Sequence, residues 1–291
     1  MKILVTGGAG NIGAHVCEEL GKHGHHVVSF DRQRGGEGRG HRVAGVTYRI
    51  GDHEDLGQFC EVASGMDAIA HLSAIPAPRT YPNATVFRTN VMGAFNTHEA
   101  AVIAGVPYVV STSSGSAFGF AWWHRPFYPK YLPMDEDHPD LAQDAYGLSK
   151  MVGETIAHGF NRRCDLRVCV IRPPWVVQPD QYETAVRTRL TAQPQDWAGS
   201  LYCYVDVRDL ATAFRLALEA PPETVQDEVF NVLADDALAT EPLSQLLPRL
   251  DPAFADLAAG LTGTQPMVSA ERIQRVLGWR PQHSWRQYLR L

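Results

Sequence analysis

The sequence contains no hydrophobic run long enough to cross a membrane. Its longest apolar stretch, residues 100–110, has 11 residues and includes Gly105 and Pro107, whereas a transmembrane helix needs about 20 apolar residues. Cysteine is also scarce. The five cysteines are scattered along the chain and form no CxxC pair. Such cysteines are typical of reduced, buried thiols. We therefore expect a cytoplasmic protein that does not contact a membrane.

The chain also lacks an excess of positive charge. Lysine and arginine number 26 while aspartate and glutamate number 32, a net charge of −6. Because nucleic acid attracts a broad positive surface, we expect no nucleic-acid partner. Residues 1–7 form a short apolar run that ends in glycine, which predicts a strand entering a turn and not a signal peptide. The composition, 45% hydrophobic and 20% charged, is that of a globular protein with one large domain or two small ones.

Short apolar runs alternate with helical stretches through most of the chain. Most of the runs are apolar without interruption, as expected for parallel strands that are covered on both faces. This alternation predicts an α/β fold with a doubly wound parallel sheet. The expected strands are 2–6, 26–30, 46–50, 68–72, 106–111, 166–171 and 228–232, and the expected helices are 12–23, 54–63, 84–104, 144–162, 207–219, 241–250 and 269–277.

Two segments interrupt the alternation. Residues 32–42 are rich in glycine and arginine, and we expect them to form a flexible surface loop. Residues 118–139 contain four prolines and are rich in aromatic side chains, among them Trp122, Trp123, Phe127, Tyr128 and Tyr131. This segment is too aromatic for a solvated loop, so we expect it to pack over another part of the protein.

A glycine-rich turn follows the first expected strand and opens the first expected helix. Gly7, Gly10 and Gly13 have the spacing GxxGxxG. One glycine permits a tight turn, one lets backbone N–H groups approach a pyrophosphate, and one lets the helix pack closely on the strand. The helix N-terminus, with Asn11 and Ile12, then faces the phosphates with the positive end of its dipole. The strand, turn and helix together predict dinucleotide binding.

An acidic residue lies at the end of the second expected strand. Asp31 comes 18 residues after Gly13, where a carboxylate accepts hydrogen bonds from the adenosine ribose hydroxyls and repels a 2′-phosphate. This favours NAD over NADP, although Arg32 could instead bind the additional phosphate of NADP. Asp52, followed by His53, is a candidate for the adenine side of the site or, alternatively, a turn or helix-capping residue.

A tyrosine and a lysine stand four residues apart in one expected helix. The sequence Tyr146-Gly147-Leu148-Ser149-Lys150 places both side chains on one helix face, one turn apart. We expect the lysine ammonium to favour the phenolate and so to lower the pKa of Tyr146. The tyrosine would then serve as a general acid and base near neutral pH, and the same ammonium could bind a nicotinamide ribose. The alternative is a surface pair on one helix face.

A serine-rich turn follows the strand expected at 106–111. Ligands of such sheets bind at the carboxyl ends of the strands, and a hydroxyl there can polarise a carbonyl or orient an alcohol. We choose Ser114 for this role, with Ser113 as the second candidate and substrate contact.

Together these motifs resemble the extended short-chain dehydrogenase/reductase family, the NAD-dependent epimerase/dehydratase group. The resemblance covers residues 1–175 closely and continues more loosely through 204–209 and 277–281. It is carried, in chain order, by the glycine turn, Asp31, His71-Leu72-Ser73-Ala74, Thr89-Asn90-Val91, the serine turn, Tyr146 to Lys150, and Arg172-Pro173.

The resemblance implies a Rossmann-type sheet of about seven strands with a small C-terminal substrate lobe. Residues 1–172 would form the dinucleotide-binding domain, segments near 201–233 would return to it, and 173–200 with 234–291 would form the lobe. It also implies catalysis by Ser114, Tyr146 and Lys150, and a homodimer formed through the helices at 84–104 and 144–162. The implied cofactor contacts include Leu72, Ser73, Ala74, Asn90, Tyr146, Lys150 and Pro173.

Within this family the sequence disfavours a dehydratase. Dehydratases of the group carry an Asp-Glu pair after the threonine of the serine turn, but here Thr112 is followed by Ser113 and Ser114. Removal of water needs a second acid and base, which this pair would supply.

The substrate lobe is expected to be compact, because only about 30 residues separate Arg172 from the motif at 204–209. This resembles uronate dehydrogenase and related enzymes of free sugars more than enzymes of nucleotide-linked sugars. Arg125, Arg187 and Arg189 are candidates for binding a phosphate or carboxylate of the substrate. The histidines near 23–26 lack any HExxH motif or Cys/His cluster, so we expect no metal.

Our first hypothesis is an NAD-dependent oxidoreductase that transfers hydride at a secondary alcohol or ketone carbon of a sugar-like substrate. The alternative, almost level, is a sugar or nucleotide-sugar epimerase that uses transient oxidation. A third hypothesis from another class is a non-catalytic dinucleotide-binding sensor, which often lacks the tyrosine and lysine that this chain retains.

Overall fold

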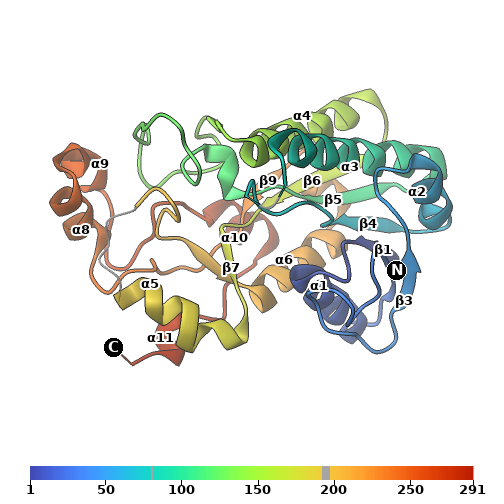
Figure 1. The fold of residues 1–291 in the computed structure, drawn as a ribbon, viewed down its shortest axis with the longest axis horizontal. Helices are drawn as coiled ribbons and strands as arrows, with labels where there is room; N and C mark the ends of the chain where they lie inside the picture. The colour runs from blue at the N-terminus through green and yellow to red at the C-terminus, as the bar shows by residue number, and fades with distance from the viewer. Residues whose placement is uncertain (80, 192–196, 291) are drawn as a thin grey trace.

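A seven-stranded parallel sheet forms the centre of the computed structural model, which describes residues 1–79, 81–191 and 197–290 (Figure 1). The strand order is β3-β2-β1-β4-β5-β6-β9. Because the chain winds outward in both directions from β1, the carboxyl ends of β1 and β4 flank a topological switch point, where ligands of such sheets bind. The strands are β1 (Lys2–Thr6), β2 (His26–Asp31), β3 (Thr47–Ile50), β4 (Ala68–His71), β5 (Tyr108–Thr112), β6 (Arg167–Arg172) and β9 (Val229–Asn231).

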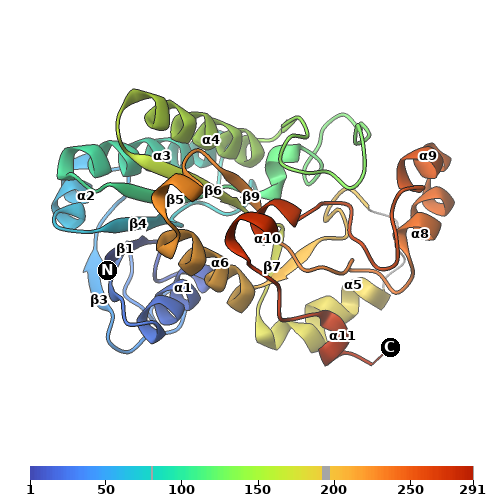
Figure 2. The ribbon, with the colours of Figure 1, turned by 180° about the vertical axis from the view of Figure 1, so that it is seen from behind.

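Helices cover both faces of this sheet (Figures 1 and 2). On one face lie α1 (Asn11–Lys22) and α6 (Val207–Glu219), which bury side chains such as Leu20 and Phe214. On the other face lie α2 (Leu56–Ala63), α3 (Asn83–Ala104) and α4 (Ala145–Arg163). Most strands are nearly continuous apolar runs that are buried on both sides, whereas the edge strand β3 is partly exposed. The predicted doubly wound α/β fold is confirmed.

Acidic caps determine where several helices begin. The Asp144 carboxylate accepts hydrogen bonds from the backbone N–H groups of Tyr146 and Gly147 at 2.9 and 3.0 Å, which fixes the start of α4. Asp206 caps α6 in the same way through the N–H of Arg208. The first turn of α4 is therefore held rigidly at the carboxyl edge of the sheet.

The rest of the chain forms a smaller lobe beyond that edge, at the left of Figure 1. Its small sheet pairs β7 (Trp175–Val177) with β8 (Tyr204–Asp206) in parallel. The segment near 201–233 returns to the large sheet, because β9 pairs with β6 and α6 covers one face of the sheet. The remaining elements are short: η1 (Gly115–Phe118), η2 (Pro179–Gln181), η3 (Tyr182–Val186), α5 (Arg187–Thr191), α7 (Pro222–Val225), α8 (Leu243–Leu250), η4 (Pro252–Phe254), α9 (Ala255–Ala258), α10 (Glu271–Leu277) and α11 (Trp285–Tyr288).

The aromatic segment at 118–139 packs against this lobe, as its composition predicts. Trp123 lies edge-on to Trp197, with 5.2 Å between ring centroids, and Trp197 lies edge-on to Phe254 at 4.7 Å. Phe120 and Phe127 belong to the same group, with 4.5 Å between their ring centroids. We call these five residues the aromatic cluster.

The glycine- and arginine-rich loop also has packing partners. The N–H of Gly40 donates to the carbonyl of Ala9 at 2.9 Å, and a Cβ at Gly40 would lie 2.3 Å from the carbonyl oxygen of Gly10. The loop therefore lies directly on the glycine turn. Among the described residues, none of the helices combines the length and hydrophobicity that a membrane span requires.

Candidate active site

The glycine turn between β1 and α1 forms a cradle that only glycine can build. Gly7 has φ of 70°, and a Cβ there would lie 2.8 Å from the backbone of Ser73. A Cβ at Gly13 would lie 2.1 Å from the carbonyl oxygen of Gly7, which shows how closely the helix approaches the turn. Gly10 caps α1, so the backbone N–H groups that begin with Asn11 and Ile12 face the open end of the turn. This geometry fits a pyrophosphate at a helix N-terminus.

Asp31 stands beside this turn at the end of β2. Its Oδ2 accepts a hydrogen bond from the N–H of Ala9 at 3.2 Å, which holds the carboxylate against the glycine turn, and its contact with an adenosine ribose stays a prediction. Arg32 points elsewhere, because its guanidinium binds both carboxylate oxygens of Asp52 at 2.9 and 3.0 Å. An arginine engaged in this way is poorly available to a 2′-phosphate, which supports NAD over NADP.

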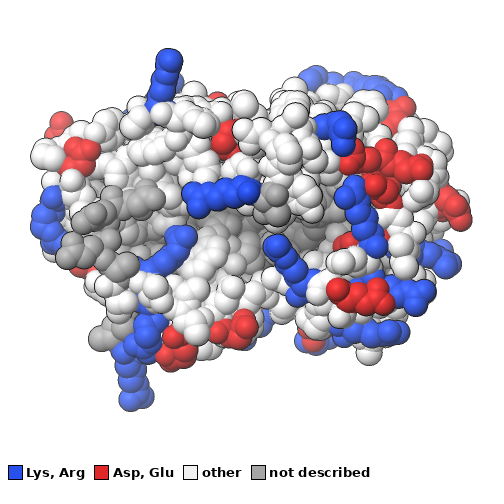
Figure 3. Space-filling view, in the orientation of Figure 1, with Lys and Arg blue, Asp and Glu red and all other residues white. Residues whose placement is uncertain are grey.

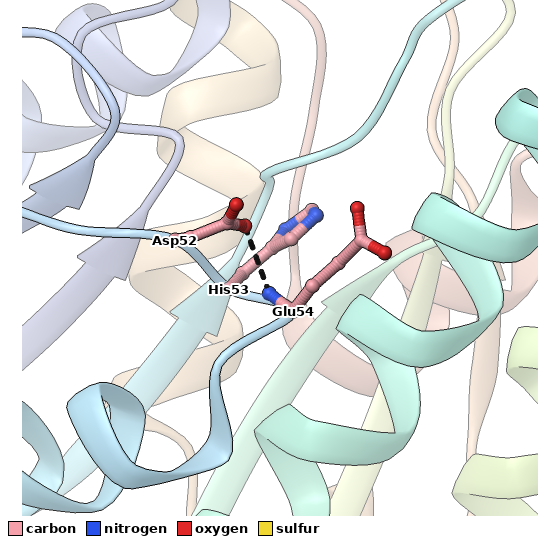
Figure 4. A group of neighbouring side chains, drawn as sticks. All are labelled: Asp52, His53 and Glu54. Atoms are coloured by element: carbon pink, nitrogen blue, oxygen red, sulfur yellow. Dashed lines mark hydrogen bonds between the residues drawn. The ribbon is translucent and has the colours of Figure 1, made fainter.

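Asp52, His53 and Glu54 lie close together after β3, as Figure 4 shows. Burial raises the pKa of Asp52, but hydrogen bonds from the N–H of Glu54 and from Arg32 outweigh it and lower that pKa. His53 is buried, which lowers its pKa, and it hydrogen-bonds the Ser73 hydroxyl. Glu54 accepts a hydrogen bond from Thr89 at 2.7 Å. The ligand atoms of this cluster are thus engaged within the protein, and both the absence of a metal and the adenine contact of Asp52 stay predictions.

The loop after β4 is tied to β1 and to α4. The N–H groups of Leu72 and Ser73 both donate to the Thr6 hydroxyl at 3.2 Å, which holds the segment with Ala74 across the switch point. Asn90 binds the backbone of Ile75 through both its amide atoms and donates to Ser149 at 3.0 Å. Asn90 therefore positions this loop against α4, and its cofactor contact remains a prediction.

Ser114, Tyr146 and Lys150 come together at the carboxyl end of β5. The Ser114 hydroxyl accepts from the N–H of Ser116 and donates to the Ser116 hydroxyl, both at 3.1 Å, and its proximity lowers the pKa of the Tyr146 phenol. Lys150 Nζ lies 5.6 Å from the centroid of the Tyr146 ring and donates to the carbonyl of Thr112 at 2.9 Å. Three residues predicted from separate motifs thus lie near one another, and their joint catalytic role stays a prediction.

The expected influence of the lysine on the tyrosine is wrong in this geometry. Burial raises the pKa of Tyr146 to about 12, the nearby Ser114 hydroxyl lowers it in part, and Asp144 raises it further. Burial also lowers the pKa of Lys150 to about 8, although the carboxylate of Glu154 partly opposes this. The ammonium is itself desolvated and directed at a backbone carbonyl, so it does not stabilise the phenolate as the spacing alone suggests.

A small cavity of about 20 Å³ lies next to Lys150 in the interior. Ser113 lines it with a buried hydroxyl that has no hydrogen-bond partner among the described residues, and the volume suffices for one water molecule. The structure thus places Ser113 toward the interior cavity, and its substrate contact stays a prediction. Pro173 lies on the other side of the serine turn, where its carbonyl accepts from the N–H of Gly115 at 2.9 Å.

The candidate substrate arginines lie in two separate segments. Arg187 forms an ion pair with Glu183 at 2.7 Å, and the guanidinium of Arg189 lies 4.4 Å above the ring of Trp175. Arg125 is exposed, and its backbone is held by the Gln143 side chain. Their contact with substrate stays a prediction.

A buried charge network behind the site was not recognised as such in the sequence. Arg172 is 4% exposed and binds Glu154 at 2.8 Å and Asp140 at 2.7 Å. Glu154 follows Lys150 by four residues, so the helical period places it on the same face of α4. The network joins α4 to the end of β6, and the spacing of Tyr146, Lys150 and Glu154 is the signal that could have revealed it. The other missed residue, Trp122, lies edge-on to Tyr146 with ring centroids 5.5 Å apart.

The glycine cradle, the acidic residue after β2 and the seven-stranded parallel sheet fit a dinucleotide-binding fold. The model of the NAD dependent epimerase/dehydratase family matches residues 3–232. The chain belongs to this family, and the predicted resemblance is confirmed.

Individual proteins of known kind show the same relationship. The chain is 26% identical to a UDP-glucose 4-epimerase of Lactobacillus helveticus over 97% of its length and 93% of that protein. It is 29% identical to a uronate dehydrogenase of Pseudomonas syringae, but this match covers only 59% of the chain and 58% of the relative. A short-chain dehydrogenase/reductase superfamily protein of Agrobacterium tumefaciens, solved with bound NAD, has a TM-score of 0.74 at 23% identity, with 99% and 94% of the two chains covered.

Proposed function

We propose that this chain is an NAD-dependent sugar epimerase that oxidises a secondary alcohol transiently and reduces the ketone from its other face. The observation that carries the proposal is that Tyr146 lies near Ser114 at the carboxyl end of β5 and has Lys150 one helical turn away. Epimerisation was the second-ranked hypothesis of the sequence analysis. It moves to first place because the epimerase relative matches almost the whole chain.

The cofactor fits the residues that are present. The close-packed cradle of Gly7, Gly10 and Gly13 would bind the pyrophosphate, Asp31 would bind the adenosine ribose, and Arg32 is paired with Asp52. Bound NAD would supply the hydride acceptor. Figure 3 shows a hollow in the middle of the molecule with Lys and Arg side chains near its edges, a setting that favours an anionic ligand.

The roles of the chain's own residues follow from their positions. Tyr146 would take the proton of the reacting hydroxyl and return it after the ketone has turned over. Ser114 would hydrogen-bond the same oxygen and hold it at the phenol. Lys150, fixed by the Thr112 carbonyl, would bind the cofactor's ribose and keep a positive charge near the proton-transfer site.

The experiment is to incubate the purified protein, with its NAD content measured, with UDP-glucose, UDP-galactose and free uronic acids. An epimerase interconverts the two nucleotide sugars, retains its cofactor and forms no net NADH. Failure to interconvert any epimeric pair, together with stoichiometric NADH from a free uronate, would overturn the proposal.

That second result is the signature of the other candidate, an NAD-dependent sugar dehydrogenase. Its support is the partial match to uronate dehydrogenase and the filled interior of the small lobe, where the aromatic cluster occupies space. The arginines described above in this lobe also have partners, such as Glu183 for Arg187. A sensor without activity is a weaker proposal, because Tyr146 and Lys150 are both present and placed together.

We also propose that two copies pair through α3 and α4, as family resemblance implies. Large apolar side chains are exposed on α3, with 38% of Phe95 and 58% of Ile103 accessible, and such patches mark interaction surfaces. Sedimentation should give a dimer, and Ile103→Glu should shift it to a monomer. Cytoplasmic localisation and the absence of a nucleic-acid partner remain proposals from composition.

A further inference from the structure

The two adjacent tryptophans of the aromatic segment face different surroundings. Trp123 packs into the aromatic cluster against Phe127 and Trp197. Trp122 belongs to no hydrophobic core cluster of the described residues and lies edge-on to Tyr146, with ring planes at 86°. One tryptophan stabilises the segment, and the other is placed at the reacting group.

The indole N–H of Trp122 is available to a ligand, as that of a partly exposed tryptophan can be. Trp279 and Trp285 are buried, and their indole N–H groups donate to backbone carbonyls at 3.0 Å. Trp122 is partly exposed, and no described residue accepts a hydrogen bond from it. A partly exposed indole with a free donor can contact a polar molecule through its N–H and an apolar one through its face.

Gln143 holds this corner in place. Its Oε1 accepts from the N–H groups of His124 and Arg125 at 3.0 and 2.8 Å, and its Nε2 donates to the Arg125 carbonyl at 2.9 Å. Gln143 directly precedes Asp144, the cap of α4. The same helix start therefore presents Tyr146 and fixes the loop that carries Trp122.

We propose that Trp122 is the wall against which the sugar ring of the substrate lies, and that Gln143 is its positioning residue. The inference rests on the proposed function. The indole lies edge-on to the Tyr146 ring with 5.5 Å between ring centroids, so a pyranose whose hydroxyl reaches Tyr146 would lie within reach of the indole. The C–H groups on either face of a pyranose pack well against an aromatic ring.

This assignment explains how one site can serve both faces of a ketone. Epimerisation requires the oxidised sugar to present first one face and then the other to the hydride donor. Directional hydrogen bonds would hold one orientation only, whereas a flat aromatic contact is non-directional and stabilises both. Trp122 therefore supports a substrate class of pyranoses with an apolar ring face.

The test compares Trp122→Ala and Trp122→Phe with Trp123→Phe as the matched control. We expect KM of the sugar to rise about tenfold in Trp122→Ala, the size expected for one lost aromatic contact, with little change in NAD affinity. Trp122→Phe should recover most of the loss. Trp123→Phe should lower the melting temperature and leave KM unchanged.

Gln143→Met tests the positioning role. It should raise the KM of the sugar, as Trp122→Ala does. The double variant Trp122→Ala/Gln143→Met should have the same KM as Trp122→Ala alone, because Gln143 acts through Trp122. An additive double variant would reduce Gln143 to a structural residue.

Calorimetric titration of the NAD-loaded protein with UDP-glucose and with glucuronate separates this inference from the proposed function. Sugar binding that weakens in Trp122→Ala, without turnover in the wild type, would refute the function and support the wall. Turnover with an unchanged KM in Trp122→Ala would refute the wall and keep the function. No sugar binding by the wild type would refute both.

Discussion

The two sides of the candidate site are held in place by different forces. On the side of α4, Tyr146 and Lys150 are positioned by directed hydrogen bonds to a helix cap and to the Thr112 carbonyl. On the opposite side, the aromatic side chains of residues 118–139 pack on Trp197 and Phe254, and Gln143 fixes only the corner at His124 and Arg125 by hydrogen bonds. Directed bonds place an atom within tenths of an ångström, whereas apolar packing tolerates change. This difference is consistent with the proposed roles, chemistry on the first side and substrate selection on the second.

The largest effect should come from removing one oxygen on the α4 side. Tyr146→Phe should lower the turnover rate by about 10²- to 10⁴-fold, because the proton acceptor is lost, while NAD affinity and melting temperature change little. Steady-state kinetics and cofactor titration measure this. Tyr131→Phe removes a hydroxyl on the aromatic side that donates to Asp135 and to no other described residue, and should keep full activity. If both variants lose the same fraction of the turnover rate, the two sides of the site do not differ in the role proposed here.

Trp197→Ala should have the opposite profile. Trp197 is 8% exposed and contacts Phe120, Trp123 and Phe254, so its truncation should cost about 3–5 kcal/mol of unfolding free energy. Urea unfolding gives the stability, and NAD titration should show a nearly unchanged affinity. Loss of cofactor binding would mean that the two sides are one cooperative unit.

The buried charge network sharpens the comparison within the α4 side. Glu154→Gln leaves the buried Arg172 with less compensation and should cost about 3 kcal/mol. The control is Glu99→Gln, which breaks an exposed Glu–Arg pair between α3 and α4 with Arg163 and should leave urea unfolding unchanged. Similar losses in both variants would show that burial is not what makes the first pair important.

The same network should make stability depend on pH. Burial raises the pKa of Asp140 to about 6, above its unfolded value near 4, so its protonated form favours the fold. The contribution is fully present below about pH 4 and is lost as pH rises through about 6, on the order of 2 kcal/mol. The unfolding free energy of Asp140→Asn, measured between these pH values, should lack this pH-dependent change. If the difference in unfolding free energy between the wild type and Asp140→Asn does not change with pH, Asp140 is not the group responsible.

The smallest effect concerns cofactor choice. Asp31→Ser should weaken NAD binding about tenfold through the loss of a charged acceptor, and should bring the affinity for NADP closer to that for NAD. Titration with both dinucleotides measures the ratio. An unchanged ratio would place the ribose away from Asp31.

Most of the sheet could be predicted from the sequence because most of its strands are uninterrupted apolar runs that alternate with recognisable helices. The strand expected at 2–6 and the helix expected at 207–219 have the observed limits. β7 and β8 have three residues each, too few for any periodicity to be visible.

The candidate site was predictable in its motifs and not in its contacts. The glycine turn and the tyrosine–lysine spacing are local patterns, so their residues were found. The contact of Trp122 with Tyr146, the pairing of Arg32 with Asp52 and the raised pKa of Tyr146 depend on burial and on residues distant in the chain. Local spacing carries no information on desolvation, which is why the expected direction of the tyrosine's pKa was wrong.

The strand that completes the large sheet is supplied late in the chain. β9 pairs in parallel with β6, and Arg172 and Asn231 are register partners although 59 residues separate them. Until the ribosome has released residues 229–231, β6 presents an unpaired backbone edge of the kind that invites aggregation. Biogenesis of this protein therefore has a vulnerable interval that closes only when the second half of the chain has been synthesised.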